Sequence, residues 1–273
     1  MTYRLFEGKE HASIYQKYRF PAPDEVKNII LQYLDEKKGQ PHELAVDLGC
    51  GTGQNSRLLA PHFEEVVGID ISECQLEEAK AVQGYPNVKY RKGTAEELPF
   101  ADGSVDLLAA ASAAHWFDQS RFLAEASRVL KPRGCIALVG YATYTSFYYQ
   151  NCGEQLRHIY EEVKQLLRPH SSRAVDLCDS KLSELYSAIP FPDKESTTAC
   201  SPYKISLIKV RHLVGFIESW SMFQAYRKTD HQAAHDLLLN TQRRCLEEMG
   251  VTCPDTEIEW ELEYYCVLAS KPQ

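Results

Sequence analysis

The chain has 273 residues, of which 44% are hydrophobic and 25% charged, and its 38 acidic and 30 basic side chains give a net charge of −8. This composition is that of a folded globular protein with room for one α/β domain and an elaboration of it. The acidic balance argues against a nucleic acid or an anionic membrane as the main partner.

The lack of long apolar runs and the spacing of the cysteines predict an intracellular protein. The first ten residues contain no apolar run, and no stretch has the length of uncharged apolar sequence that a membrane span requires. The nine cysteines are odd in number, spread along the chain and never spaced as Cys-x-x-Cys, which argues against a disulfide framework or a zinc cluster. We therefore expect reduced thiols and a cytoplasmic location.

Alternating helices and strands are predicted for the first half of the chain. An apolar stripe predicts an amphipathic helix over residues 24–38, which Gly39 ends. Short buried strands are expected at 44–48, 66–70, 87–90, 105–108 and 135–139, with helices at about 55–60, from Ser72 onward and over 118–130. Five such strands joined by helical segments imply right-handed crossovers and a mostly parallel sheet.

The second half is less regular. Helices are predicted at 150–168, 178–188, 209–220 and 231–249, with a strand around 196–207 and an alternating final strand from Ile258. We expect an α/β, Rossmann-like fold: a seven-stranded, mostly parallel sheet with helices on both faces and an inserted lid region. Its expected parts are an N-terminal arm and helix (1–40), a binding core (41–141), a lid or substrate face (142–255) and a C-terminal strand that completes the sheet (256–273).

A glycine-rich turn follows the first strand, with the sequence Asp47-Leu48-Gly49-Cys50-Gly51-Thr52-Gly53. The glycines allow positive φ and a close approach of the backbone to a ligand, and the next helix begins with unpaired N–H groups. Asp70 ends the second strand, where a carboxylate can accept hydrogen bonds from ribose hydroxyls. The pattern predicts a nucleoside site.

Two nucleoside cofactors compete for this site. A dinucleotide site prefers Gly-x-Gly-x-x-Gly because a pyrophosphate sits against the helix, whereas the spacing here is Gly-x-Gly-x-Gly. Asp47 would repel a phosphate, but it suits the ammonium of an amino-acid group. S-adenosylmethionine has an ammonium, a ribose and no phosphate, so the residues favour it over NAD.

Four blocks in order between residues 46 and 139 resemble the class I methyltransferases of the ubiquinone-biosynthesis type. They are the glycine turn, Val-Gly-Ile-Asp-Ile-Ser around Asp70, Gly-Thr-Ala-Glu-Glu-Leu-Pro-Phe from Gly93, and Arg-Val-Leu-Lys-Pro-Arg-Gly from Arg128. In two places the chain departs from the family: Thr94 stands where Asp is frequent, and Arg133 replaces the usual Gly.

The resemblance implies S-adenosylmethionine as the cofactor and a role for each matching residue. It implies that Asp70 holds the ribose, that backbone groups of the glycine turn contact the methionine part, and that the segment after Gly93 faces the adenine. The full predicted cofactor site is Asp47, Gly49, Cys50, Gly51, Gly53, Asn55, Asp70, Ile71, Thr94, Ala95, Glu96 and Ala111.

The acceptor site is expected beyond the fourth strand, because the crevice of an open α/β sheet lies at the carboxyl ends of its strands. The segment there, Ala-Ser-Ala-Ala-His-Trp-Phe from Ala111, lacks the Asn/Asp-Pro-Pro-Tyr/Phe of amino-directed nucleic-acid methyltransferases. It is similar to the trans-aconitate methyltransferase group. The arm from Phe6 to Pro21 and the Ser-Trp-Ser segment from Ser219 are also similar to that group, which implies an arm folded over the cofactor.

His115 is the nearest candidate for a general base, which a hydroxyl, thiol or amine acceptor would use and a carboxylate would not need. The alternative is a histidine that only packs at the strand end. The candidate substrate contacts are Tyr15, Arg19 and Trp116, although Trp116 also suits the core.

Two further groups of side chains are weaker candidates. Arg121, Arg211 and Arg227 could also clamp a carboxylated substrate, because the guanidinium fork matches a carboxylate. His231 and His235 share a helical face, but they lack the third ligand of a zinc site and are interpreted as solvated.

Four functions are compatible with the sequence. The leading one is methylation of a small molecule at a carboxylate or other oxygen, with no nucleic-acid, membrane or metal partner. The others are methylation of a protein, a non-catalytic module that binds the cofactor, and an NAD-linked oxidoreductase, which the glycine spacing disfavours. A closed lid would favour a small substrate, and an open acidic trough would favour a basic protein. The sequence leaves the acceptor and the oligomeric state undetermined.

Overall fold

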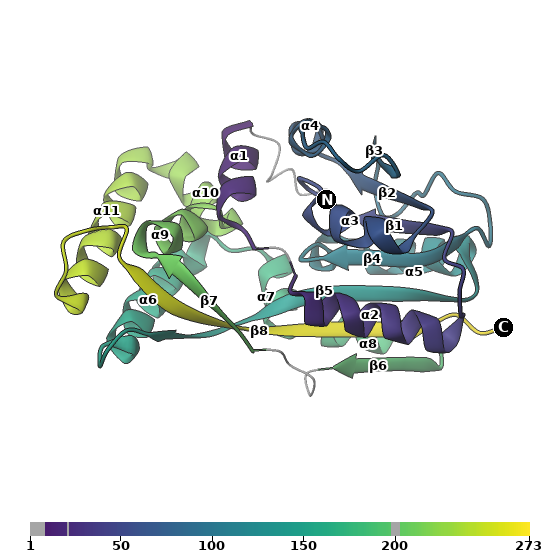
Figure 1. Cartoon of the computed structure of the whole chain (residues 1–273). Helices are drawn as coiled ribbons and strands as arrows, with labels where there is room; N and C mark the ends of the chain where they lie inside the picture. The colour runs from purple at the N-terminus through teal and green to yellow at the C-terminus, as the bar shows by residue number, and fades with distance from the viewer. Residues whose placement is uncertain (1–8, 21, 198–202) are drawn as a thin grey trace.

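A computed structural model describes residues 9–20, 22–197 and 203–273 (Figure 1). The start of the predicted arm at Phe6, its end at Pro21 and part of the predicted strand around residue 200 therefore lie outside the described residues. The strands are β1 (Leu44–Leu48), β2 (Glu65–Asp70), β3 (Val88–Lys92), β4 (Val105–Ala111), β5 (Leu130–Tyr148), β6 (Asp193–Thr197), β7 (Tyr203–Lys209) and β8 (Glu257–Ser270).

These strands form one sheet in the order β3-β2-β1-β4-β5-β8-β6, with β7 paired to β8 beside that path. The first five are mutually parallel, and β8 runs antiparallel to β5, β6 and β7. The mostly parallel Rossmann-like sheet is confirmed, but the described residues hold eight strands rather than the predicted seven. The segment expected as one strand around 196–207 contributes two, because β8 is long enough to pair with β6 along 266–270 and with β7 along 257–263.

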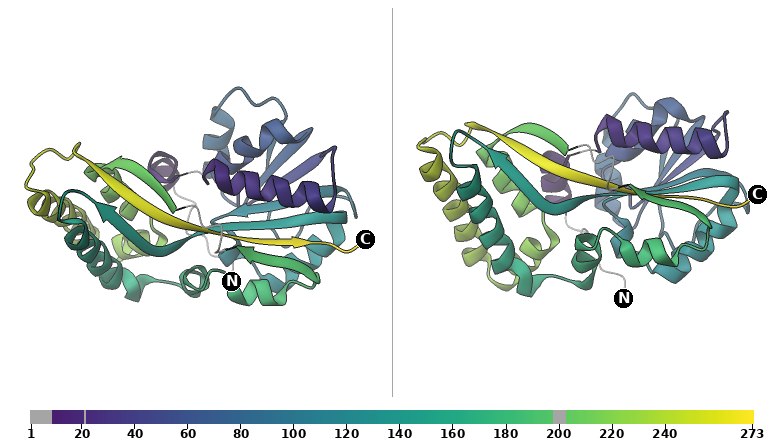
Figure 2. Two further views of the ribbon diagram at one scale, coloured as in Figure 1. Left: turned by 60° about the horizontal axis from the view of Figure 1, so that its bottom comes forward. Right: turned by 90° about the horizontal axis from the view of Figure 1, so that it is seen from below.

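The helices cover both faces of the sheet (Figures 1 and 2). Alternate strand residues face opposite layers: Ala45 packs with the helix before β1, and Val46 packs with the helix before β5. The α-helices are α1 (Lys9–Tyr18), α2 (Asp24–Lys37), α3 (Gln54–Leu59), α4 (Glu73–Ala81), α5 (Gln119–Val129), α6 (Gly153–Leu167), α7 (Arg173–Asp179), α8 (Ser183–Ala188), α9 (Val210–Glu218), α10 (Ser221–Thr229) and α11 (His231–Met249).

Local capping explains where several helices begin. The Ser72 hydroxyl accepts a hydrogen bond from the Gln75 amide at the start of α4, and Asp118 does the same for Arg121 at the start of α5. The helix predicted over 231–249 is α11 with the same bounds, and it ends at Gly250 with φ of 66°. The predicted helix over 178–188 is instead divided into α7 and α8, because Lys181 and Leu182 adopt positive φ between them.

The longest departure from the prediction concerns β5, which was expected to end at residue 139. It continues to Tyr148 beside β8, with a register shift between Tyr141 and Thr145. The continuation alternates buried Thr145 and Phe147 with more exposed neighbours, a period-two pattern that the sequence reading missed. The two strands thus carry the sheet out of the core and into the second half of the molecule (Figure 1).

A helical extension packs on these projecting strands, formed by α6, α9, α10 and α11 (Figure 2). Its centre is aromatic: the Trp260 ring lies 4.7 Å from Phe216 and 5.7 Å from Phe147, measured between ring centroids. α1 touches both α4 of the core and α9 of the extension, so it spans the space between the two halves. Helix α10 was not predicted.

None of the described helices is long and apolar enough to cross a bilayer. The cysteines within the described ranges are all free thiols, and Cys200 lies outside those ranges.

Candidate functional site

Three adjoining chambers open at the carboxyl ends of the parallel strands, between the core and the extension. The first encloses about 900 Å³, the second about 560 Å³ and the third about 790 Å³, open space at their mouths included. Tyr15 and Ser112 line all three. The chambers therefore form one continuous cleft with a shared joint, defined here by Tyr15 and Ser112.

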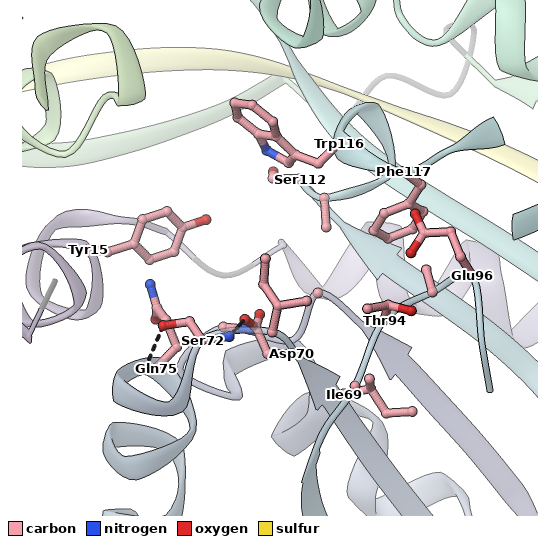
Figure 3. A pocket seen from close by; sticks show the side chains of 16 residues that line it. Tyr15, Ile69, Asp70, Ser72, Gln75, Thr94, Glu96, Ser112, Trp116 and Phe117 are labelled. Carbon is pink, nitrogen blue, oxygen red and sulfur yellow. Dashed lines mark hydrogen bonds between the residues drawn. The ribbon is translucent and has the colours of Figure 1, made fainter. Parts of the chain in front are cut away.

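Asp70 lies on the floor of the first chamber, at the end of β2 (Figure 3). Its two carboxylate oxygens accept backbone hydrogen bonds of 2.8 Å from Gly51 and Ser72, which ties the glycine turn to the loop after β2. Burial raises the pKa of this carboxyl. Each oxygen keeps a second lone pair, so the group can still accept a hydroxyl from a ligand.

The glycine turn has three residues with positive φ, and each glycine meets a different neighbour. A Cβ at Gly49 would lie 2.5 Å from the Ala113 side chain, and one at Gly53 would lie 2.1 Å from the Tyr90 hydroxyl. A Cβ at Gly51 would meet only the Gln75 amide oxygen at 3.6 Å. Gly51 is thus the place where the backbone faces open chamber, whereas Gly53, predicted to bind cofactor, lines none of the three chambers and packs on Tyr90.

Asp47 is buried at the floor of the second chamber. Its carboxylate accepts hydrogen bonds from Asn55 Nδ2 at 2.8 Å and from Ser56 Oγ at 2.5 Å, both on α3. Burial raises the pKa of Asp47 to about 6. The second chamber also includes the predicted cofactor residues Gly49, Cys50, Gly51, Asn55 and Ala111 in its lining.

The segment after β3 closes the side of the first chamber opposite Tyr15 (Figure 3). The chamber includes Ile71, Thr94, Ala95 and Glu96, the residues predicted to face the adenine, in its lining. The Glu96 carboxylate accepts a hydrogen bond of 2.8 Å from the Asp118 amide, so one of its oxygens already positions the start of α5.

His115 lines the third chamber beside Trp116, with 5.1 Å between ring centroids. Burial, with the positive charge of Arg19 adding to it, lowers the pKa of His115 to about 4. The imidazole is therefore neutral at pH 7. Among the described residues neither ring nitrogen has a hydrogen-bond partner, in contrast to the satisfied histidine of the packing interpretation.

Arg19 lies between two aromatic rings in the wall of the third chamber, 4.7 Å from the Phe216 centroid and 5.0 Å from the Tyr15 centroid. Its Nε donates to Ser219 Oγ at 2.7 Å, and another guanidinium nitrogen donates to the Tyr141 hydroxyl. These contacts tie the end of the arm to the α9–α10 junction. With a longer bond of 3.4 Å from Nη2 to the Ser219 carbonyl, three of the N–H groups of Arg19 are used within the protein.

The other candidate side chains lie away from the cleft. Arg211 pairs with Asp255 at 2.6 Å and Arg227 with Glu10 at 2.8 Å, and Arg121 lines none of the three chambers. His231 and His235 are exposed on α11, as expected for a solvated face.

The sequence reading missed several lining residues. Ser112, at the joint, has a φ of 53°, which is uncommon for a residue other than glycine and occurs often at functional sites. The extension supplies Tyr160 and Lys164 from α6 to the third chamber, and helix α7, outside the extension, supplies Cys178 and Asp179. No local pattern marks these positions, because only the folding of the extension onto the core brings them there. The Ser-Trp-Ser segment was a usable signal for Trp220 and Ser221, which also line it.

Comparisons with known proteins agree with this geometry. Residues 46–138 match the family model described as a methyltransferase domain. A Dictyostelium discoideum protein named as a methyltransferase is 29% identical, over 94% of this chain and 92% of its own length. The trans-aconitate 2-methyltransferase of Deinococcus radiodurans is 39% identical over 102 residues, which are 36% of this chain and 38% of that protein.

Among solved structures, a protein from Anaeromyxobacter dehalogenans that is described as a type II methyltransferase is similar, with a TM-score of 0.71 and 24% identity. The match covers 94% of this chain and 100% of that chain. At this level of identity the likeness concerns the fold, and it extends to the helical extension as well as the core.

Proposed function

We propose that this chain transfers a methyl group from S-adenosylmethionine to a small molecule, at a carboxylate or another oxygen. The premise is its methyltransferase domain over residues 46–138, together with a fold similar to that of a solved protein described as a methyltransferase. The observation that carries the proposal is the joined cleft. Two chambers with the features of a nucleoside and amino-acid site meet a third, aromatic chamber at Tyr15 and Ser112.

The residues of the first two chambers fit S-adenosylmethionine. Asp70 retains lone pairs for ribose hydroxyls, and Ile71 and Ala95 offer apolar surface for an adenine. At Gly51 a side chain would project into open space, so the backbone there can approach a ligand closely. Asp47 supplies a buried carboxylate for an ammonium, and none of the described residues lining either chamber has a basic side chain that would attract a phosphate.

The bound cofactor supplies an electrophilic methyl carbon on a sulfonium. The acceptor oxygen forms a bond to that carbon as the carbon–sulfur bond breaks, so the protein has to align the two groups and exclude water. Tyr15, which belongs to the joint, and Trp116 each line both the first and the third chamber, so they can hold an acceptor in line with the methyl group. Ser112, whose backbone has a positive φ, follows the last residue of β4 and lies at the joint as well.

His115 is the proposed base when the acceptor is a hydroxyl. Its neutral imidazole has a free nitrogen to accept the hydroxyl proton. A pKa of about 4 makes it a weak base, so a carboxylate acceptor, which has no proton to lose, suits this chamber better.

The form of the third chamber favours a small acceptor over a protein. Side chains from the arm, α6, α7, α9 and α10 surround it, as expected for a lid, and most of them are aromatic or apolar rather than acidic. A trough for a basic protein would need exposed carboxylates along its walls. The non-catalytic alternative is disfavoured because Asp47, Gly51 and Asp70 are all in place in the cleft.

The test has two steps. Calorimetric titration with S-adenosylhomocysteine and with NAD should give binding of the first alone; binding of NAD alone would indicate an oxidoreductase, and binding of neither a scaffold. Transfer of a labelled methyl group onto panels of carboxylic acids, alcohols and a basic peptide library should then label a small acid or alcohol. Labelling of peptides alone would contradict the proposed acceptor.

His115→Ala separates the two acceptor classes. With an alcohol acceptor, we expect kcat to fall by about 10²–10⁴ with an unchanged affinity for S-adenosylhomocysteine, because the proton acceptor is removed. With a carboxylate acceptor the rate should change little. A loss of cofactor affinity would instead favour the packing interpretation of His115.

A further inference from the structure

The third chamber contains a cation that the proposed reaction does not use. Lys164, on α6, lines this chamber and neither of the other two. Within the described part of the chain its ammonium has no ion pair or hydrogen bond, although the residue is partly buried. A partly buried ammonium without a partner indicates a place for an anion that is not part of the chain.

The other charged groups of the chamber do not neutralise Lys164. Asp179 lines the same chamber, and its Oδ2 pairs with Arg168 at 3.0 Å, while its Oδ1 is buried and accepts no hydrogen bond from the described residues, Lys164 included. Arg19 is held by Ser219 and Tyr141, and His115 is neutral. Arg19 keeps its positive charge, but neutral oxygen atoms of Ser219 and Tyr141 already accept three of its N–H groups. Lys164 is therefore the cation of this chamber that has all its donors available to a ligand, as far as the described residues go.

Lys164 lies on the side of the third chamber away from the joint, whereas Arg19 lies on the side nearer the cofactor chambers. Arg19 contacts Tyr141, which lines both the second and the third chamber, so it belongs to the side nearest the cofactor. Lys164 comes from the extension and lines the third chamber alone. A run of ring contacts leads from Arg19 towards Lys164: Arg19 lies over Phe216, Phe216 packs on Trp220, and Trp220 packs on Tyr160, which is one helical turn before Lys164 on α6.

We propose that Lys164 is a specificity-determining residue that pairs with a second anionic group of the acceptor, remote from the oxygen that receives the methyl group. The inference rests on the proposed function in one respect, the assignment of the third chamber to the acceptor. The acceptor is then an acid with an apolar body and a distal anion. The body packs on the aromatic wall while the reacting oxygen lies at the joint.

Binding can be measured without turnover. The probes are linear dicarboxylic acids of six to ten carbons, monocarboxylic acids of the same length, and ω-phosphono carboxylic acids, titrated calorimetrically into protein saturated with S-adenosylhomocysteine. At least one dicarboxylic acid should bind tenfold or more tightly than its matched monoacid. The phosphono acids show whether a carboxylate or a phosphate is the preferred distal group.

Three variants assign the preference to Lys164. Lys164→Met should remove the tenfold advantage of the diacid, and Lys164→Arg should restore most of it. Lys228→Met is the matched control, an exposed lysine on α10 outside the chamber, and it should keep the full advantage. In the transfer assay, Lys164→Met should raise KM for the diacid at least tenfold with kcat changed less than twofold.

The outcomes also distinguish this inference from the proposed function. Equal binding of diacid and monoacid, binding of neither, or an advantage that survives in Lys164→Met overturns the role of Lys164, even if methyl transfer to an acid is observed. A diacid advantage that Lys164→Met removes supports that role, even if no oxygen is methylated and the proposed reaction fails.

Discussion

Asp70 has two tasks, and its removal should affect both. Asp70→Ala is expected to weaken S-adenosylhomocysteine binding at least tenfold, because the ribose loses its acceptor. It also leaves the Gly51 and Ser72 amides without their partner, so we expect the free energy of unfolding to fall by about 1–3 kcal/mol. Calorimetry and denaturant unfolding measure the two effects, and unchanged affinity would show that the ribose is held elsewhere.

Asp47 makes cofactor binding dependent on pH. Because burial raises its folded pKa to about 6, the carboxylate that would attract an ammonium forms only above that value. We expect the affinity for S-adenosylhomocysteine to rise between pH 5 and pH 7. In Asp47→Asn the affinity should be low, and this pH dependence should disappear. An identical pH profile in both proteins would place the ammonium elsewhere.

The raised pKa of Asp47 affects the stability of the unliganded protein in the opposite direction from cofactor binding. The folded pKa lies above the unfolded one, so the contribution of Asp47 to stability is fully present below about pH 4 and is lost as the pH rises through about 6. Without a ligand, the buried carboxylate therefore lowers stability near neutral pH. A buried carboxylate that destabilises the unliganded protein agrees with a role for Asp47 in binding an ammonium.

At the scale of the element, the glycine turn allows a matched pair of substitutions. Gly51→Ala and Gly53→Ala both place alanine at positive φ, which costs about 1–2 kcal/mol. Gly53→Ala also forces a contact with Tyr90 and should be the less stable protein. Gly51→Ala should be the one that loses S-adenosylhomocysteine affinity by tenfold or more, because its new methyl group enters the first chamber.

Thermal unfolding and calorimetry of the two variants separate these effects. Equal loss of affinity in both variants would mean that the turn acts only through its general conformation. Retained affinity in Gly51→Ala would mean that the cofactor does not approach the backbone there.

Elements with local signals were predictable, and those that depend on distant contacts were not. Asp47, Gly51 and Asp70 follow strands whose apolar runs are short and clear, so topology alone brings them to one crevice. The continuation of β5 was missed because its partner, β8, lies more than a hundred residues later. Lys164 has an ordinary place on an amphipathic helix, and only the packing of α6 turns it toward the cleft.

At the scale of the whole molecule, α1 links the two halves over the cleft. Tyr15 lines all three chambers, and His11 and Arg19 bind Ser219 at the junction of α9 and α10. We expect S-adenosylhomocysteine to slow amide hydrogen exchange in α1, because the ligand adds contacts to Tyr15 and reduces local opening.

Helix α11 provides an internal control for that measurement, because none of its residues lines the chambers. Its exchange should not change on binding. Equal slowing in both helices would indicate a general stabilisation of the fold rather than closure of the arm. Exchange in α1 that does not respond to the ligand would show that the arm takes no part in binding.

The position of β8 inside the sheet affects how the chain can fold during translation. This strand lies between β5 and β6 and also supports β7, yet it is the last described element along the chain. On the ribosome, therefore, a nascent chain exposes the open edge of β5 until the final strand emerges. During translation at about 5–20 residues per second, that unpaired edge is available to chaperones or to other nascent chains.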